Sequence, residues 1–126
     1  MKKIAASVML LLAIIACNSR YEQENDDKGN IVRRTSERSP FSEYDLEMKG
    51  TFTFDEDGTA ITGIPAQGYA EYKYNNITIN ARPAKDGTPI VTIFEKGEKV
   101  EAGSDKGKEY LEDAIGRMQK LQAKFK

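Results

Sequence analysis

The sequence predicts an α+β domain, with an antiparallel sheet of about five to six short strands covered on one face by a C-terminal helix. Three observations predict it. Apolar and polar residues alternate with period 2 from residue 44 onward, and clusters of Gly, Pro, Asn and Asp interrupt this alternation at short intervals. After residue 104 the apolar spacing changes to 3 and 4, which is typical of an amphipathic helix.

The first strand is expected over residues 44–54, with one face wet. Its alternate positions carry Tyr44, Leu46, Met48, Gly50, Phe52 and Phe54. The acidic turn at residues 55–58 follows, in which Gly58 can supply a positive φ. A second short strand is then expected over residues 59–64.

Further strands are expected over residues 69–74 and 77–81, joined at Asn75 and Asn76, residues that tolerate left-handed backbone. The stretch IVTIF at residues 90–94 is strongly β-forming, and a short strand is expected around Val100. These segments complete a meandering antiparallel sheet.

The C-terminal helix is expected to span about 20 residues, with Ser104 or Asp105 as its N-cap. Its apolar stripe consists of Tyr110, Leu111, Ala114, Ile115, Met118, Leu121 and Phe125. Gly107 and Gly116 weaken the helix slightly, and Gly116 is interpreted as a point of close packing.

Residues 18–42 contain few apolar residues, mixed charges and no period, which indicates a disordered tether. We expect residues 17–42 to hold the domain, residues 43–126, away from its attachment point. A passive spacer is one interpretation. The other is a sorting signal, because residues 24–28 resemble the lysine-plus-acidic patch of surface-exposed lipoproteins of the Bacteroidota, although the order and position differ.

The N-terminus combines Lys2 and Lys3 with an apolar run over residues 4–16, the layout of a secretory signal peptide. This run is too short to span a membrane as a helix, which needs about 20 residues. The stretch LLAIIAC ends at Cys17, the single cysteine, and resembles the bacterial lipoprotein lipobox. The resemblance implies that residues 1–16 are removed and that Cys17 receives acyl chains such as palmitate.

This resemblance also implies a location. A lipobox protein is held in the bacterial cell envelope by its acylated cysteine, so the membrane is the expected partner of Cys17. Asn18 is not the aspartate that retains lipoproteins in the inner membrane of enterobacteria, which favours the outer membrane. The sequence leaves open whether the domain faces the periplasm or the cell surface.

Composition argues against several kinds of chemistry. Histidine and tryptophan are absent, which removes imidazole acid–base catalysis, histidine metal ligands and the strongest aromatic platform. A net charge of −1 without a dense basic cluster argues against nucleic-acid binding. An EF-hand loop starting at Asp55 would need an acid where Ala66 stands, so we expect no metal and no cofactor.

Residues 50–69 combine a strand ending in Phe, an acidic turn, the pattern Thr-x-Ile-x-x-Ile and a Gly-aromatic pair. This pattern is similar to an element of bacterial envelope proteins, including the periplasmic parts of some membrane-bound sensor metallopeptidases. The resemblance would cover about residues 44–123 and implies a fold of strands followed by a helix. The zinc-peptidase motif is missing from this chain, so no peptidase activity is implied.

The first functional hypothesis is therefore a lipid-anchored, non-catalytic envelope protein that binds an unknown protein partner or has a structural role. The second is a small-ligand or glycan-binding lipoprotein that presents Tyr69, Tyr72 or Tyr74. A minor hydrolase is a third hypothesis, although no pair of acids is marked for it. The sheet face opposite the helix separates the first two: polar and flat favours a protein partner, open and aromatic favours a glycan.

Overall fold

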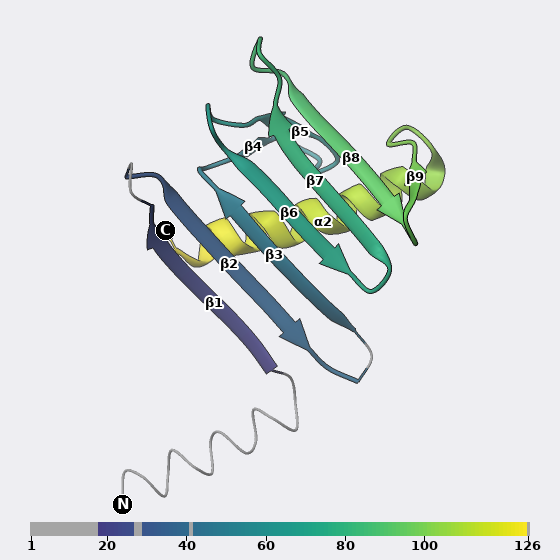
Figure 1. The fold of residues 1–126 in the computed structure, drawn as a ribbon, viewed down its shortest axis with the longest axis horizontal. Coiled ribbons are helices and arrows are strands. Elements are labelled where there is room, and N and C mark those ends of the chain that lie inside the picture. The colour runs from purple at the N-terminus through teal and green to yellow at the C-terminus, as the bar shows by residue number, and fades with distance from the viewer. Residues whose placement is uncertain (1–17, 27–28, 41, 126) are drawn as a thin grey trace, which may run out of the picture.

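The computed structural model describes residues 18–26, 29–40 and 42–125, which form a seven-stranded antiparallel sheet, a two-stranded sheet and one helix (Figure 1). The seven strands, in their order across the large sheet, are β1 (Asn18–Asn25), β2 (Ile31–Arg38), β3 (Glu43–Lys49), β6 (Tyr69–Tyr74), β7 (Ile77–Pro83), β8 (Pro89–Glu95) and β9 (Glu98–Val100). The predicted α+β class is confirmed.

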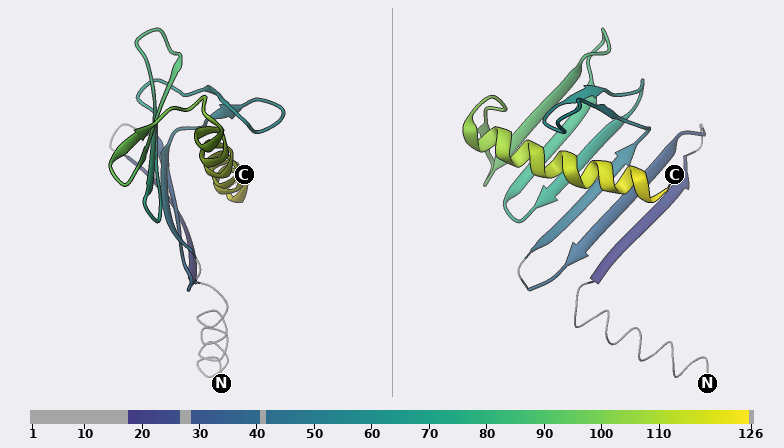
Figure 2. Two further views of the ribbon diagram at one scale, coloured as in Figure 1. Left: turned by 90° about the vertical axis from the view of Figure 1, so that its right-hand side faces the viewer. Right: turned by 180° about the vertical axis from the view of Figure 1, so that it is seen from behind.

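The helix α2 (Asp105–Lys124) runs across one face of the large sheet (Figure 2). The small sheet, formed by β4 (Thr53–Phe54) and β5 (Ile61–Gly63), lies on the same side of the large sheet as α2. The molecule therefore has two layers, and no helix or strand of the described residues covers the other face of the large sheet.

The core lies between the sheet and α2. It is filled by side chains that alternate along the central strands and by the apolar stripe of the helix, as predicted from their spacing. Its largest members, each at most 2% exposed, are Leu46, Met48, Phe52, Tyr72, Ile79, Ile93, Ile115, Met118 and Leu121. Burial of each such side chain contributes about 1.5–3 kcal/mol to folding.

The expected single strand over residues 44–54 is wrong, because the chain leaves the large sheet at Gly50. Gly50 has φ +83°, and a Cβ atom on it would lie 2.4 Å from Cγ of Pro65. Only glycine fits this position without strain. The following residues turn away to form β4, which pairs with β5, so that Phe52 and Ile61 reach the core from the side of α2.

The expected disordered tether is also wrong for the described part of residues 18–42, which contains β1 and β2. The buried positions of β2 that face α2 carry the polar residues Arg33 and Thr35, so hydropathy does not reveal the strand. Arg33 is 8% exposed and donates from Nε to Oε1 of Gln23 at 3.0 Å, and Thr35 is 4% exposed. The signal peptide over residues 1–16 and the acylation of Cys17 concern residues outside the described ranges.

Helix α2 begins as expected, with Ser104 as its N-cap. The Ser104 hydroxyl accepts a hydrogen bond from the Gly107 N–H at 3.0 Å. The interpretation of Gly116 as a close-packing point is wrong, because Gly116 is exposed and an added Cβ would meet no atom within 4 Å. Within the described residues, α2 does not combine the length and the apolar character that crossing a membrane requires.

Candidate functional site

The open sheet face, the side of the large sheet opposite α2, carries many charged side chains. Side chains on this face alternate along each strand with those that enter the core. Across the four strands from β1 to β6 it carries Arg20, Glu22, Glu24, Arg34, Ser36, Arg38, Asp45, Glu47, Glu71 and Lys73. Both signs of charge are interspersed, so the face is polar and has no strong net charge.

A chain of hydrogen bonds crosses four strands on this face. Arg34 Nη1 donates to Glu24 Oε1 at 2.6 Å, and Arg34 Nε donates to Glu47 Oε1 at 2.5 Å. The Tyr69 hydroxyl donates to the other oxygen, Glu47 Oε2, at 2.6 Å. The network Glu24–Arg34–Glu47–Tyr69 thus joins β1, β2, β3 and β6 through their side chains.

These contacts set the protonation of the network. Burial alone would raise the pKa of the Glu47 carboxyl, but the hydrogen bonds from Tyr69 and Arg34 lower it below its usual value. The bonds to Glu24 and Glu47 raise the pKa of the Arg34 guanidinium, and the bond to Glu47, with burial, raises the pKa of Tyr69 to about 12. The Arg34 guanidinium therefore stays protonated and the Glu47 carboxylate stays ionised throughout the physiological pH range.

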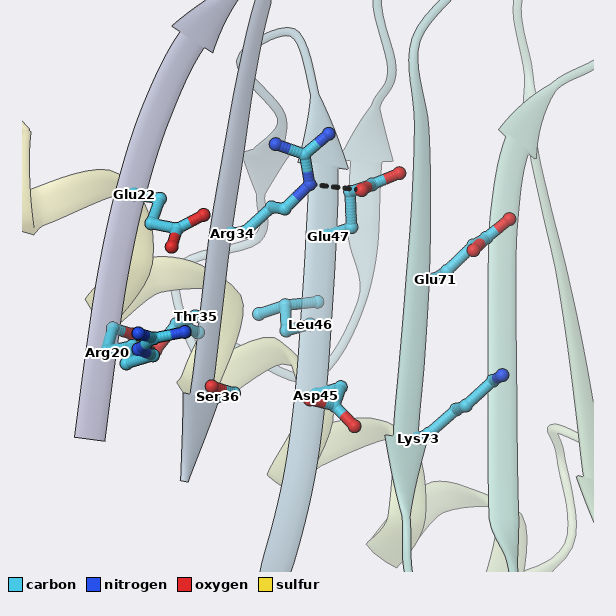
Figure 3. A pocket seen from close by; sticks show the side chains of 10 residues that line it. All are labelled: Arg20, Glu22, Arg34, Thr35, Ser36, Asp45, Leu46, Glu47, Glu71 and Lys73. Carbon is cyan, nitrogen blue, oxygen red and sulfur yellow. Dashed lines mark hydrogen bonds and ion pairs between the residues drawn. The ribbon is translucent and has the colours of Figure 1, made fainter. Parts of the chain in front are cut away.

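A shallow hollow of about 360 Å³ lies beside the network (Figure 3). It forms because Ser36 is short and stands in register between Arg20 on β1 and Asp45 on β3. Asp45 is held by Arg38, whose Nη2 donates to both carboxylate oxygens at 3.0 and 3.1 Å. Among the described residues, the side chains of Arg20, Glu22, Glu71 and Lys73, which also line the hollow, form no ion pair.

The other end of the open face, over β6, β7 and β8, is less charged. A second hollow of about 400 Å³ is lined there by Tyr69, Arg82, Ile90, Thr92 and Phe94, together with neighbouring residues. Ile90 is 37% exposed, the largest exposure of any large hydrophobic side chain in the described residues. An apolar patch therefore borders the charged part of the face.

The three tyrosines proposed as ligand contacts do not form one platform. Tyr69 lies on the open face, whereas Tyr72 and Tyr74 point to the side of α2 because side chains alternate along β6. Tyr72 is 1% exposed, and its hydroxyl donates to Asp113 Oδ2 at 2.8 Å. Its ring centroid lies 6.4 Å from that of Tyr74, and the two rings are stacked at 16°.

Tyr74 does line a groove of about 300 Å³ between α2 and the strands β6 and β7. Its other walls include Ile77, Glu109, Tyr110 and Asp113. The Tyr110 hydroxyl donates to Glu95 Oε2 at 2.7 Å, which fixes that ring at the edge of the groove.

The acidic turn after β4 is occupied by its own backbone. The Asp55 carboxylate accepts hydrogen bonds from the Thr59 hydroxyl at 2.6 Å, the Thr59 N–H at 2.7 Å and the Ala60 N–H at 3.0 Å. The bond from the Thr59 hydroxyl, with those from the backbone, lowers the pKa of Asp55. In the described part of the chain, no three Cys, Asp or Glu side chains are grouped so that they could hold a metal ion.

Sequence reasoning did not find Glu24 and Arg34, because both fall in the segment expected to be a tether. Sequence reasoning also gave no partner for Glu47. Strand β3 pairs with β6, and the two strands between them in the sequence, β4 and β5, form a separate sheet. No protein-family model matches the chain, and the searches of curated proteins and of solved structures found no match.

Proposed function

We propose that the protein is a lipid-anchored, non-catalytic protein of the cell envelope that binds a protein partner through its open sheet face. The observation that carries the proposal is that this face is uncovered and polar, with an apolar patch at one end. The lipobox-like stretch that ends at Cys17 supports the anchor.

The composition of the open face suits a protein partner. Protein interfaces place a few aromatic, aliphatic and arginine side chains inside a polar rim, and these side chains supply most of the binding energy. Tyr69, Phe94 and Arg82 provide such anchors around the second hollow. Glu71 and Lys73, which form no ion pair with another described residue, can select a partner whose charges are complementary.

The position of β1 determines how an anchor at Cys17 would hold the domain. Strand β1 begins at Asn18, directly after the cysteine, so no spacer separates the acyl chains from the sheet. Two or three acyl chains bind a bilayer stably, whereas one chain binds only marginally. We propose that the outer membrane carries this anchor and that the domain lies directly on its surface.

The first experiment is the intact mass of the protein extracted from membranes, wild type beside Cys17→Ala. The expected mass is that of a chain beginning at Cys17 with acyl chains added. The Cys17→Ala variant should show neither the cleavage nor the acyl chains. A wild-type protein that still contains residues 1–16, or that lacks acyl chains, refutes the anchor.

The second experiment locates the partner site by photo-crosslinking in cells. A crosslinking residue is placed at Lys73 or Thr92 on the open face, and at exposed Glu112 on α2 as the matched control. We expect a discrete adduct from the two open-face positions, absent from the control and lost when Phe94 is changed to Ala. No adduct from the open face, or the same adduct from Glu112, contradicts the proposal.

A second candidate function, binding of a glycan or small ligand, is favoured by the groove beside Tyr74 and Tyr110. Aromatic rings next to the carboxylates of Glu109 and Asp113 can stack on a sugar ring and accept hydrogen bonds from its hydroxyls. The chain has no tryptophan, so tyrosine emission can report binding directly. Titration with soluble oligosaccharides that changes this emission in wild type but not in Tyr110→Ala would support the candidate, and no change in either protein would exclude those sugars.

A further inference from the structure

Strand β1 forms one edge of the large sheet and is neither short nor bent, although it carries the charged side chains Arg20, Glu22 and Glu24. It pairs with β2 over eight consecutive residues without a register shift, and it contains neither proline nor lysine. At the opposite edge, β9 has only three residues. Long, regular edge strands present unpaired backbone groups to another strand, and proteins normally shorten, bend or charge them to prevent such pairing.

The charges of β1 are arranged for a partner strand. Arg20 and Glu22 lie two residues apart on the open face, and neither forms an ion pair with another described residue. The third charge, Glu24, is already bound by Arg34. An antiparallel strand that carries the same two residues in reverse order would neutralise both.

We propose that β1 pairs with β1 of a second copy of this chain, antiparallel and in register about a two-fold axis at Tyr21. In this register Arg20 of each copy stands opposite Glu22 of the other, and Ser19 stands opposite Gln23. The pairing joins the two large sheets into one continuous sheet. Both helices then lie on the same side of it, because the axis of an antiparallel pair is perpendicular to the sheet.

Neighbouring registers that keep the same faces aligned are less favourable. Centring the pair on Arg20 places two arginines directly opposite each other, and centring it on Glu22 does the same with two glutamates. Like charges directly opposite destabilise a strand pair, whereas opposite charges and aromatic pairs stabilise it. Centring on Tyr21 also brings two tyrosine rings together on the side of α2. Within one copy, Nζ of Lys124 lies 5.3 Å from the centroid of the Tyr21 ring.

Charge exchange tests the register. The full chain is extracted from membranes in detergent, and its self-association is measured by sedimentation equilibrium. Arg20→Glu and Glu22→Arg each turn both symmetric pairs into like-charge pairs, so each variant should weaken the dimer by roughly tenfold or more. The double variant R20E/E22R restores opposite charges and should restore the dimer. Both side chains are on the edge strand, and circular dichroism verifies that the variants fold.

Cysteines introduced one at a time test the axis in native membranes. Residues directly opposite have Cβ atoms about 4.5–5.5 Å apart, so Tyr21→Cys should form a disulfide-linked dimer on mild oxidation. Ser19→Cys and Gln23→Cys are matched controls, because each lies about 14 Å from its own copy in this register. The wild-type chain measures any linkage through Cys17. A monomeric wild type, a dimer unaffected by both charge variants, or equal crosslinking at Ser19 and Tyr21 overturns the proposal.

Discussion

The two glycines of α2 provide a quantitative test of how the helix meets the rest of the fold. At Gly116, an added Cβ would meet no atom within 4 Å, so Gly116→Ala gains helix propensity alone, about 0.5–1 kcal/mol. At Gly107, the same atom would lie 2.1 Å from the carbonyl oxygen of Glu101 and 3.0 Å from Cα of Ala102. Because backbone atoms cannot move aside cheaply, we expect Gly107→Ala to cost about 1–3 kcal/mol despite the gain in propensity.

Urea and thermal unfolding followed by circular dichroism measure both effects. Gly116→Ala should raise Tm by about 2–8 °C, and Gly107→Ala should lower it by at least about 4 °C, with an unchanged urea dependence. The pair is internally controlled, because both variants add one methyl group to the same helix. A Gly107→Ala protein as stable as wild type would refute the close contact with the Glu101 carbonyl, and a destabilised Gly116→Ala protein would refute the open surface at that position.

Three further predictions concern the polar contacts. The pKa of Tyr69 is raised from an ordinary 10 to about 12, so its hydrogen bond to Glu47 contributes stability that is complete below pH 10 and is lost as pH rises towards 12. Between these pH values, the urea midpoint of Tyr69→Phe should fall less than that of wild type. Ser104→Ala removes the N-cap of α2 and should lower the free energy of unfolding by about 1 kcal/mol, with Ser104→Asp as the control that keeps it. Tyr72→Phe removes only the hydroxyl bonded to Asp113 and should cost about 1 kcal/mol, whereas Tyr72→Ala, which empties a core site, should cost about 3–5 kcal/mol; equal losses would contradict the packing.

The parts of the fold that could be predicted are those in which one face is apolar. In β6, β7 and β8 the core-facing positions carry Ala70, Tyr72, Ile79 and Ile93, so period 2 is visible in the sequence. Helix α2 shows its stripe for the same reason. One face of each of these elements is removed from water, and this both buries the apolar side chains and sets their spacing in the sequence. Hydropathy therefore locates these elements well.

Strands β1 and β2 could not be predicted because most of their covered positions carry polar side chains. Arg33 and Thr35 point towards α2 and are buried, and their polar atoms are satisfied by Gln23, Thr51 and the carbonyl oxygen of Arg20. A hydropathy pattern cannot distinguish a buried, hydrogen-bonded arginine from a solvated one. The low apolar content of residues 18–42 therefore suggested a tether where the chain forms two strands.

The site was less predictable than the fold because it depends on which strands are neighbours. Glu47 and Tyr69 are 22 residues apart and meet only because the small sheet leaves the large one and β6 returns beside β3. The sequence contains both residues, but the excursion that joins them begins at Gly50, where φ is positive. Local periodicity carries no information about such a pairing.

The proposed anchor and the proposed strand pairing together would determine an orientation on the membrane. In the proposed dimer the first residue of β1 in one copy, Asn18, lies opposite Glu24 of the other, so the two β1 starts that follow the proposed anchors are about 20 Å apart along the strand. Both anchors reach one bilayer equally only when the two-fold axis is perpendicular to it, and the joined sheet then lies parallel to the membrane. The open face is then free for a protein partner only if α2 faces the bilayer. The exposed side of this helix carries the lysines Lys106, Lys108, Lys120 and Lys124 together with the acids Asp105, Glu109, Glu112 and Asp113, so these charges balance. A single anchored copy has no such constraint, so self-association through β1 would decide which face of the sheet is presented.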